Sequence, residues 1–171
     1  MADVGRPLKF KSVEELDGQS DGFFAFCGDK LCTNQFAKEK DVEDFISNNI
    51  ELFTKDILND ELISFEIDAS IRKPHGFAPR GRRVDLVVQG KKKLYIIELK
   101  NPLSGTENRA AIGQILDYGR EYLDSKKELI IITTKFDTNT AKTIKYYNLP
   151  IRYIYMDKKR FLEFVEDKKN D

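Results

Sequence analysis

The 171-residue sequence has little of the side-chain chemistry on which many enzymes depend, with one histidine and only two cysteines. Zinc and iron–sulfur sites usually need about four cysteine or histidine ligands, which Cys27 and Cys32 cannot supply. We expect two reduced thiols there, with a disulfide as the alternative. A Ser-His or Cys-His mechanism would have to use His75, which lies in a proline- and glycine-containing loop segment. The sequence therefore argues against cysteine-ligated clusters and nucleophilic triads.

Net charge and long apolar runs are also missing. The 29 basic residues balance 29 acidic ones, so the chain as a whole lacks the basic excess of many nucleic-acid-binding proteins. No apolar run is long enough to span a membrane, and the first residues lack the apolar stretch of a signal peptide. With 40% hydrophobic and 34% charged residues, the composition suits one compact domain. We expect a cytoplasmic protein without membrane contact.

Three charged residues stand inside two otherwise apolar segments. Asp85 lies in the run from Val84 to Val88, and Glu98 and Lys100 lie in the run from Leu94 to Lys100. Charged side chains are rarely buried without a partner. Residues two apart on a strand share a face, so Glu98 and Lys100 point the same way. The basic turn between the two runs is typical of a hairpin connection, which would place Asp85 beside them.

The chemistry of such a cluster follows from its charges. Two neighbouring carboxylates repel each other and favour a divalent cation, and oxygen ligands with retained water suit Mg²⁺, with Mn²⁺ as a substitute. A bound ion of this kind can orient a phosphodiester and lower the pKa of a water molecule. Lys100 would position or deprotonate that water and add positive charge near the phosphate. The sequence predicts metal-assisted phosphodiester hydrolysis.

This arrangement resembles the PD-(D/E)xK nuclease superfamily, whose signature is an aspartate, a variable spacer and then (Asp/Glu)-x-Lys on paired strands. Asp85, Glu98 and Lys100 match the signature, and Val84 stands where the family often has proline. The resemblance implies that Asp85 and Glu98 bind the metal ion together with the backbone carbonyl of Leu99. It also implies a Mg²⁺-dependent deoxyribonuclease with a restriction-endonuclease-like fold, and it covers about residues 36 to 157.

A helix is predicted over residues 108–123, where Ala111, Ile115 and Tyr118 form part of an apolar stripe. Gln114 and Tyr118 lie one turn apart on this helix. Their Gln-x-x-x-Tyr pattern is similar to that of RecB-like exonucleases, and the resemblance implies that Gln114 orients the substrate with Tyr118 as an auxiliary residue. A tyrosine on an apolar stripe suits the core equally well, so both interpretations of Tyr118 stay open.

A second helix is predicted over residues 38–55, and it carries two candidate carboxylates. Glu39 falls nearer the centre of the apolar stripe of this helix than Glu43 does. The segment is similar to the opening helix of the NucS-like branch of the superfamily. That resemblance implies that Glu39 contributes to catalysis and to the metal site, with Glu43 as the alternative. Both glutamates could instead be solvated helix residues.

The rest of the pattern predicts an α/β protein with a restriction-endonuclease-like core, in which helices flank a mixed central β-sheet. Residues 36–171 would form the nuclease domain, with a core order of α, β, β, β, α, β and a further α, β, α at the C-terminus. Residues 1–35 would be an extension with a short helix and a hairpin, and could cover a sheet edge, form a homodimer interface or contact substrate. Further strands are expected at 61–72, 128–134 and 151–155, and further helices at 138–147 and 159–168.

Basic residues gather where a DNA backbone would need them. Arg80, Arg82 and Arg83 precede the Asp85 strand, and Arg109 begins the helix that carries Gln114. Arginines at these positions could contact phosphates. We therefore expect DNA as the partner, through these four residues.

Three functions agree with the sequence. The first is a metal-dependent nuclease that hydrolyses DNA in repair, recombination, defence or a mobile-element or viral context. The second is a catalytically silent nucleic-acid-binding scaffold, because a fold alone does not confer chemistry. The third is a partner-dependent subunit of a nuclease complex. The intact Asp85, Glu98 and Lys100 set favours the first.

Overall fold

A five-stranded mixed sheet forms the centre of the protein. The computed structural model describes residues 36, 38–70, 83–102, 105–122 and 126–156. Along the chain the elements are α3 (Glu39–Asn48), α4 (Ile50–Asp56), β1 (Leu62–Ser70), β2 (Arg83–Gly90), β3 (Leu94–Lys100), α5 (Gly105–Glu121), β4 (Lys127–Thr133), α6 (Thr138–Tyr146) and β5 (Ile151–Tyr155). The prediction of an α/β protein with a mixed sheet and flanking helices is confirmed.

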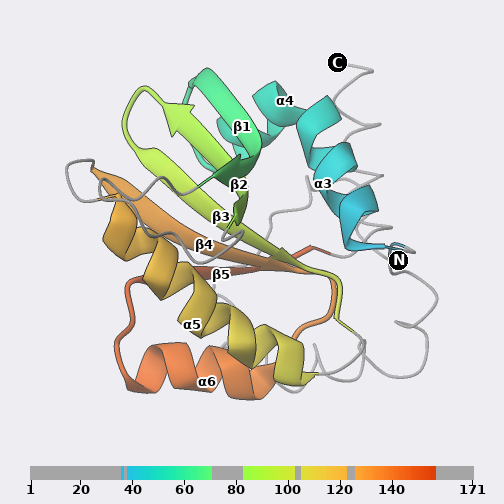
Figure 1. Cartoon of the computed structure of the whole chain (residues 1–171), viewed down its shortest axis with the longest axis vertical. Coiled ribbons are helices and arrows are strands. Elements are labelled where there is room, and N and C mark those ends of the chain that lie inside the picture. The colour runs from blue at the N-terminus through green and yellow to red at the C-terminus, as the bar shows by residue number, and fades with distance from the viewer. Residues whose placement is uncertain (1–35, 37, 71–82, 103–104, 123–125, 157–171) are drawn as a thin grey trace, which may run out of the picture.

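The strands follow each other across the sheet in the order of the sequence, β1-β2-β3-β4-β5. The first three strands are antiparallel, whereas β3, β4 and β5 run parallel to one another. Parallel neighbours need crossover connections, and α5 and α6 supply them. These two helices lie on one face of the sheet, while α3 and α4 lie on the other (Figure 1). Two helical layers therefore cover the central strands from both sides.

The apolar core follows from this layering. β3 and β4 are buried on both faces, so their sequences are nearly continuous apolar runs rather than alternating ones. One cluster, which includes Val42, Ile46 and Ile97, packs between α3 and the sheet. The other, which includes Ile96 and Ile115, packs between α5 and the opposite face. A polar side chain on β3 is therefore surrounded by apolar packing unless it lies near the end of the strand.

The edge strand β1 differs from its prediction. We expected a half-buried strand over residues 61–72, of which residues 71 and 72 lie outside the described residues. The described strand leaves Ile63 61% and Phe65 41% exposed. A register shift between Leu62 and Ser64 breaks the alternation. Such a bulge changes which residues face the core, and an edge strand has a paired neighbour on one side only. The sequence pattern could not show that this strand lies at an edge.

The single helix predicted over residues 38–55 is interrupted. The chain leaves helical geometry at Asn49, whose φ of −124° separates α3 from α4. The Asn49 side-chain amide donates to the carbonyl oxygen of Phe45 at 2.8 Å. Asparagine competes with the helix by hydrogen bonding to nearby backbone groups. The apolar stripe continues across the break because Ile46 and Ile50 are both buried, and this continuity made the break invisible to periodicity.

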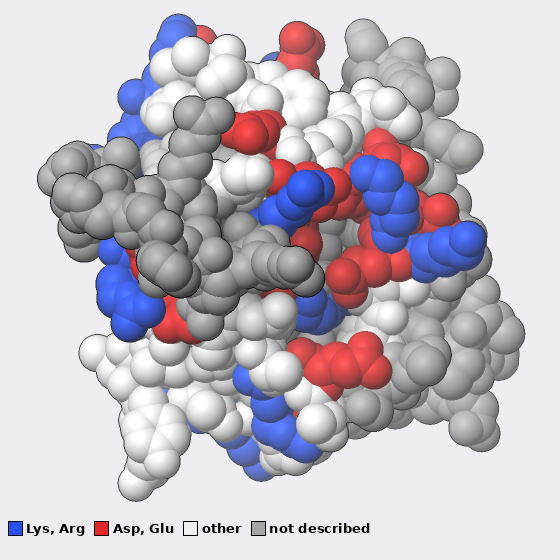
Figure 2. Space-filling view, viewed as in Figure 1, with Lys and Arg blue, Asp and Glu red and all other residues white. Residues whose placement is uncertain are grey.

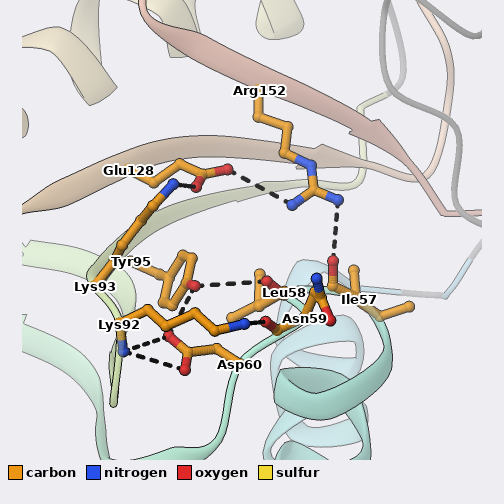
Figure 3. Close-up of polar contacts among 9 residues, drawn as sticks. All are labelled: Ile57, Leu58, Asn59, Asp60, Lys92, Lys93, Tyr95, Glu128 and Arg152. Carbon is orange, nitrogen blue, oxygen red and sulfur yellow. Dashed lines mark hydrogen bonds and ion pairs between the residues drawn. The ribbon is translucent and has the colours of Figure 1, made fainter.

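A polar network anchors the far end of α4 to the sheet (Figure 3). The buried Asp60 carboxylate accepts hydrogen bonds from the Tyr95 hydroxyl at 2.9 Å and the Lys92 backbone N–H at 3.0 Å. A Cβ atom at Gly90 would lie 2.2 Å from this carboxylate, so the turn requires glycine there. Burial by itself would raise the pKa of Asp60, but hydrogen bonds from the Glu61 and Lys92 backbones and from Tyr95 hold it below its usual value.

Arg152, on the opposite edge strand β5, bonds to the loop between α4 and β1. Its guanidinium donates to the Ile57 carbonyl at 2.9 Å and lies 3.6 Å from a Glu128 oxygen. The other Glu128 oxygen accepts from Lys93 at 2.7 Å. The α4–β1 loop is thus bonded to β3, to the β2–β3 turn and to β5.

Some predictions lie outside the described residues. These are the N-terminal helix and hairpin in 1–35 and the terminal helix at 159–168. Among the helices that the structure describes, none is long and apolar enough to cross a membrane.

Removing the Tyr95 hydroxyl should destabilise the fold. We expect Tyr95→Phe to lower the free energy of unfolding at pH 7 by about 1–2 kcal/mol, because a buried hydrogen bond to a charged group is lost. The loss should shrink as the pH falls below about 4 and on through the lower pKa of folded Asp60, because protonation removes the charged acceptor of the Tyr95 hydroxyl. Urea unfolding at several pH values measures both effects. Tyr146→Phe, at a site 81% exposed, is the control, and an equal loss there would contradict this account.

Candidate active site

The two strands that carry the charged residues separate at the site. β2 and β3 pair from Gln89 opposite Leu94 to Leu86 opposite Ile97. At the next position the Asp85 carboxylate, through Oδ2, accepts a hydrogen bond from the Leu99 backbone N–H at 2.7 Å. A side chain thus replaces the backbone acceptor that a continued ladder would supply. The strands diverge here without leaving that N–H unpaired.

Glu98 lies next to Asp85 on the adjacent strand, and its side chain points to the same face as Lys100. The Lys100 Nζ atom donates to Glu98 Oε1 at 2.6 Å. Glu98 is only 1% exposed, and its other oxygen, Oε2, is buried without a hydrogen-bond partner among the described residues. Buried carboxylate oxygens are normally satisfied. The unsatisfied Oε2 therefore marks a position where a cation or a donor would be stabilised.

These side chains open into a cavity of about 460 Å³. Residues from α3, β2, β3 and α5 line it: Glu39, Arg83, Asp85, Glu98, Lys100, Gln114, Asp117 and Tyr118. The cavity thus brings together the three strand residues, the favoured carboxylate of the first helix and both residues of the Gln-x-x-x-Tyr pattern. Tyr118 also belongs to the apolar cluster under α5, so it contributes to the core and to the cavity wall.

The structure separates the two candidate glutamates of the first helix. Glu39 Oε1 lies 3.9 Å from Lys100 Nζ, and Glu39 Oε2 accepts from the Asn101 backbone N–H at 3.2 Å. The helical-wheel prediction is wrong about burial, because the Glu43 side chain is 9% exposed and the Glu39 side chain is 46% exposed. Glu43 pairs with Lys40 on its own helix and does not line the cavity, although its charge helps to raise the pKa of Asp85. The acidic first turn of α3 suits a helix N-terminus, and it places Glu39 next to the end of β3.

The electrostatics of the site are dominated by its buried carboxylates. Burial and the neighbouring Asp85 charge raise the pKa of Glu98 to about 7, against the opposing effect of Lys100. Burial also raises the pKa of Asp85, although the Leu99 N–H and Lys100 oppose the rise. Burial would lower the pKa of Lys100, but the charges of Glu98, Glu39 and Asp85 raise it above its usual value. Lys100 therefore keeps its proton at neutral pH.

The structure describes two of the four predicted phosphate-binding arginines, and one of these two lies at the cavity. Arg83 lines it, whereas Arg80 and Arg82 lie outside the described residues. Arg109 does not line the cavity: it donates to Thr106 at 3.1 Å and lies 3.7 Å from an Asp137 oxygen. Figure 2 shows acidic and basic side chains intermingled on one face, without a continuous basic surface among the coloured residues. Attraction of phosphate at the described part of the site therefore depends on local charges.

Sequence reasoning missed two polar residues at the site. Asp117 lines the cavity one turn after Gln114, and its position between Gln114 and Tyr118 on the same helix was the available signal. Asn101 follows Lys100 directly and contacts Glu39. Nothing in the strand periodicity distinguishes Asn101 from an ordinary residue after a strand.

The donor set is small but suits a hard divalent cation. In the described part of the chain, no group of three or more histidine, cysteine, aspartate or glutamate side chains has an arrangement able to hold a metal ion. Mg²⁺ commonly takes one or two carboxylates and retains several waters. Asp85 and Glu98, with the unsatisfied Glu98 Oε2, provide such a pair. The further ligands expected from the sequence, Glu39 and the Leu99 carbonyl, stay predictions.

Comparison with known proteins finds no matching family model, no matching curated protein and no matching solved structure.

The raised pKa of Glu98 should make metal-free protein less stable as the pH rises. Folding raises the pKa of Glu98 from its ordinary value of 4.5 to about 7, so folded Glu98 binds its proton more tightly than the unfolded residue does. The contribution of Glu98 to the free energy of unfolding is therefore fully present below about pH 4.5 and is lost as the pH rises towards 7. We expect Glu98→Gln to remove this slope, a difference of about 1–3 kcal/mol across the window. Urea unfolding in EDTA between pH 4.5 and 7.5 measures it.

The control for this slope is Glu51→Gln, which removes a negative charge from an exposed position on α4. This variant should show the same dependence of the free energy of unfolding on pH as the wild type. An unchanged slope in Glu98→Gln would mean that Glu98 titrates as an ordinary surface carboxylate.

Proposed function

We propose that this protein is a Mg²⁺-dependent nuclease that hydrolyses phosphodiester bonds of DNA on a restriction-endonuclease-like core. One observation carries the proposal: Glu98 is buried next to Asp85, has an unsatisfied oxygen, and lies beside Lys100 in an open cavity. The choice of DNA rests on the resemblance to the PD-(D/E)xK superfamily. Mn²⁺ is expected to substitute for Mg²⁺.

A purely structural role for these residues is a weaker explanation. Two carboxylates and one ammonium leave an excess of negative charge in a largely buried site, and removing charges from water is costly unless they are fully compensated. A structural ion pair of Lys100 with Glu98 alone would need no second carboxylate beside it. A divalent cation would compensate Asp85 and Glu98 together, and this is why the group is better explained by metal binding.

A silent phosphate-binding scaffold is also disfavoured. Among the residues that the structure describes, four acidic and two basic side chains line the cavity. Such a lining repels a phosphodiester unless a cation is present. Binding of nucleic acid at this cavity therefore depends on the same metal ion that the nuclease would use.

The residues divide the chemistry between them. In hydrolysis the oxygen of a water molecule bonds to phosphorus and gives up a proton to the solvent, the bond to the leaving oxygen breaks, and the leaving oxygen takes a proton from the solvent. Mg²⁺, held by Asp85 and Glu98, would supply Lewis-acid stabilisation of the charge on the phosphate oxygens. Lys100, which donates to Glu98, would serve as a positive donor that orients the water and the phosphate.

The outer residues would position the substrate. Gln114 is exposed on α5 at the cavity wall, where its amide can donate to and accept from a nucleotide. Arg83 lies at the start of β2 and adds positive charge for a phosphate. Glu39 adds a second carboxylate near Lys100, with its Oε1 at 3.9 Å from the ammonium nitrogen.

A cleavage assay tests the proposal. Purified protein is incubated with linear duplex, circular duplex and single-stranded DNA in Mg²⁺ or Mn²⁺, with EDTA as the metal-free control. We expect cleavage by the wild type, no cleavage in EDTA, and a loss of about 100-fold or more in Glu98→Gln, because a candidate metal ligand is removed. Glu51→Gln removes the same charge at an exposed position that does not line the cavity, and it should cleave normally.

The outcomes distinguish the functions. Equal cleavage by Glu98→Gln and the wild type would point to a contaminating nuclease and refute the proposed site. Metal-dependent DNA binding without cleavage on any substrate would favour the silent scaffold or the partner-dependent subunit.

Lys100→Met should separate metal binding from turnover. The variant keeps both carboxylates but loses the ammonium, so we expect it to bind Mn²⁺ at least as tightly as the wild type while its cleavage rate falls by about 100-fold. Titration of free Mn²⁺ by electron paramagnetic resonance and single-turnover cleavage measure the two effects. Wild-type turnover in Lys100→Met would exclude Lys100 from the chemistry.

A further inference from the structure

We propose that Asn101 is the positioning residue that holds Glu39 at the cavity, by joining the start of α3 to the ends of β3 and β4. This role rests on the proposed function, because it concerns the carboxylate of the first helix in the same site.

Three hydrogen bonds define the position of Asn101. Its backbone N–H donates to Glu39 Oε2 at 3.2 Å. Its side-chain amide donates to the Phe36 carbonyl at 2.6 Å, and its side-chain oxygen accepts from the Thr134 hydroxyl at 2.5 Å. One residue thus contacts the segment before α3, the first turn of α3 and the residue after β4.

Thr134, the partner of the Asn101 side-chain oxygen, is held in position by the sheet. The Thr134 backbone N–H donates to the Lys100 carbonyl at 3.0 Å, and Thr134 is 1% exposed. The Thr134 hydroxyl is therefore held in place by the parallel pairing of β3 and β4. Asparagine is needed between Thr134 and Phe36 because its amide offers an acceptor and a donor on one short side chain. Aspartate could not donate to the Phe36 carbonyl.

Burial alone does not hold Glu39 in the cavity. Its side chain is 46% exposed, and its Oε1 lies 3.9 Å from Lys100 Nζ, a contact that solvent weakens. A half-exposed glutamate at a helix end has several accessible rotamers. The hydrogen bond from the Asn101 backbone N–H selects the Glu39 rotamer that points to Lys100. The Asn101 side chain, through its bond to the Phe36 carbonyl, keeps the start of α3 close enough to β3 for that hydrogen bond to form.

The test compares two buried threonines that are adjacent in sequence. Thr134→Val removes the hydroxyl that bonds to Asn101, whereas Thr133→Val removes a hydroxyl that bonds to the Lys135 carbonyl at 2.8 Å. Thr133→Val also loses the hydrogen bond that the Thr133 hydroxyl accepts from the Lys135 backbone N–H at 3.3 Å, so this control removes at least as much buried hydrogen bonding as Thr134→Val does. Both variants keep nearly the same volume. Asn101→Ala removes the whole side-chain connection and serves as the second test variant.

Two readouts are measured on each full-length variant. Hydrogen exchange of the Asn101 backbone amide reports the contact with Glu39 without reference to activity. The dissociation constant of Mn²⁺, from electron paramagnetic resonance without DNA, reports the consequence for the site. We expect Thr134→Val and Asn101→Ala to increase amide exchange about tenfold and to weaken Mn²⁺ binding about three- to tenfold, with no such change in Thr133→Val.

A double-mutant cycle with Glu39→Ala distinguishes positioning from general destabilisation. If Asn101 acts through Glu39, Thr134→Val has no further effect on Mn²⁺ binding in the Glu39→Ala background. The role of Asn101 would be overturned, with the proposed function left standing, by either of two results. One is that the effects of Thr134→Val and Glu39→Ala on the Mn²⁺ dissociation constant multiply in the double variant; the other is that Thr134→Val keeps wild-type amide exchange and wild-type Mn²⁺ binding. Absence of both Mn²⁺ binding and cleavage in the wild type would instead overturn the proposed function, and the positioning role with it.

Discussion

The hydrogen bond from the Leu99 backbone N–H to the Asp85 carboxylate is the interaction on which the site depends. Two paired strands cannot separate inside a protein unless their freed backbone groups find other partners. Asp85 provides that partner at 2.7 Å, so β2 and β3 diverge at the position where Glu98 and Lys100 lie on the open face. The same bond fixes Asp85 next to Glu98, and the raised pKa of Glu98 follows from burial and from that proximity.

The helical layer of α3 and α4 is attached to the sheet by polar contacts at both ends and by apolar packing between them. At the site end, Asn101 bonds to Glu39 and to the segment before the helix. At the far end, Asp60 and Arg152 bond the loop after α4 to the sheet. Apolar packing between these ends is non-directional, so the polar contacts are what determine where a side chain such as Glu39 lies relative to the strands.

Much of the fold was predictable because its elements have strong local signals. The buried strands are continuous apolar runs, and their limits agree with the predicted ones to within one residue for β3, β4 and β5. The hairpin between β2 and β3, read from a basic turn between two apolar runs, places Asp85 and Glu98 together as expected. Periodicity failed where a local interaction changed the geometry: the Asn49 side chain interrupts the first helix, and a bulge changes the facing of β1.

The sequence by itself determined which residues share a face, because strand and helix periods are local properties of the backbone. It therefore identified Asp85, Glu98, Lys100, Gln114 and Tyr118 as residues of one face or one helix. It misjudged the first helix, where Glu43 is buried and Glu39 is exposed. Only the tertiary structure decided which faces meet: that Asp117 joins the cavity, that Arg109 turns to Asp137 instead, and that Asn101 connects three elements. These contacts join residues up to 65 positions apart, and their geometry depends on how the layers pack, which no local period encodes.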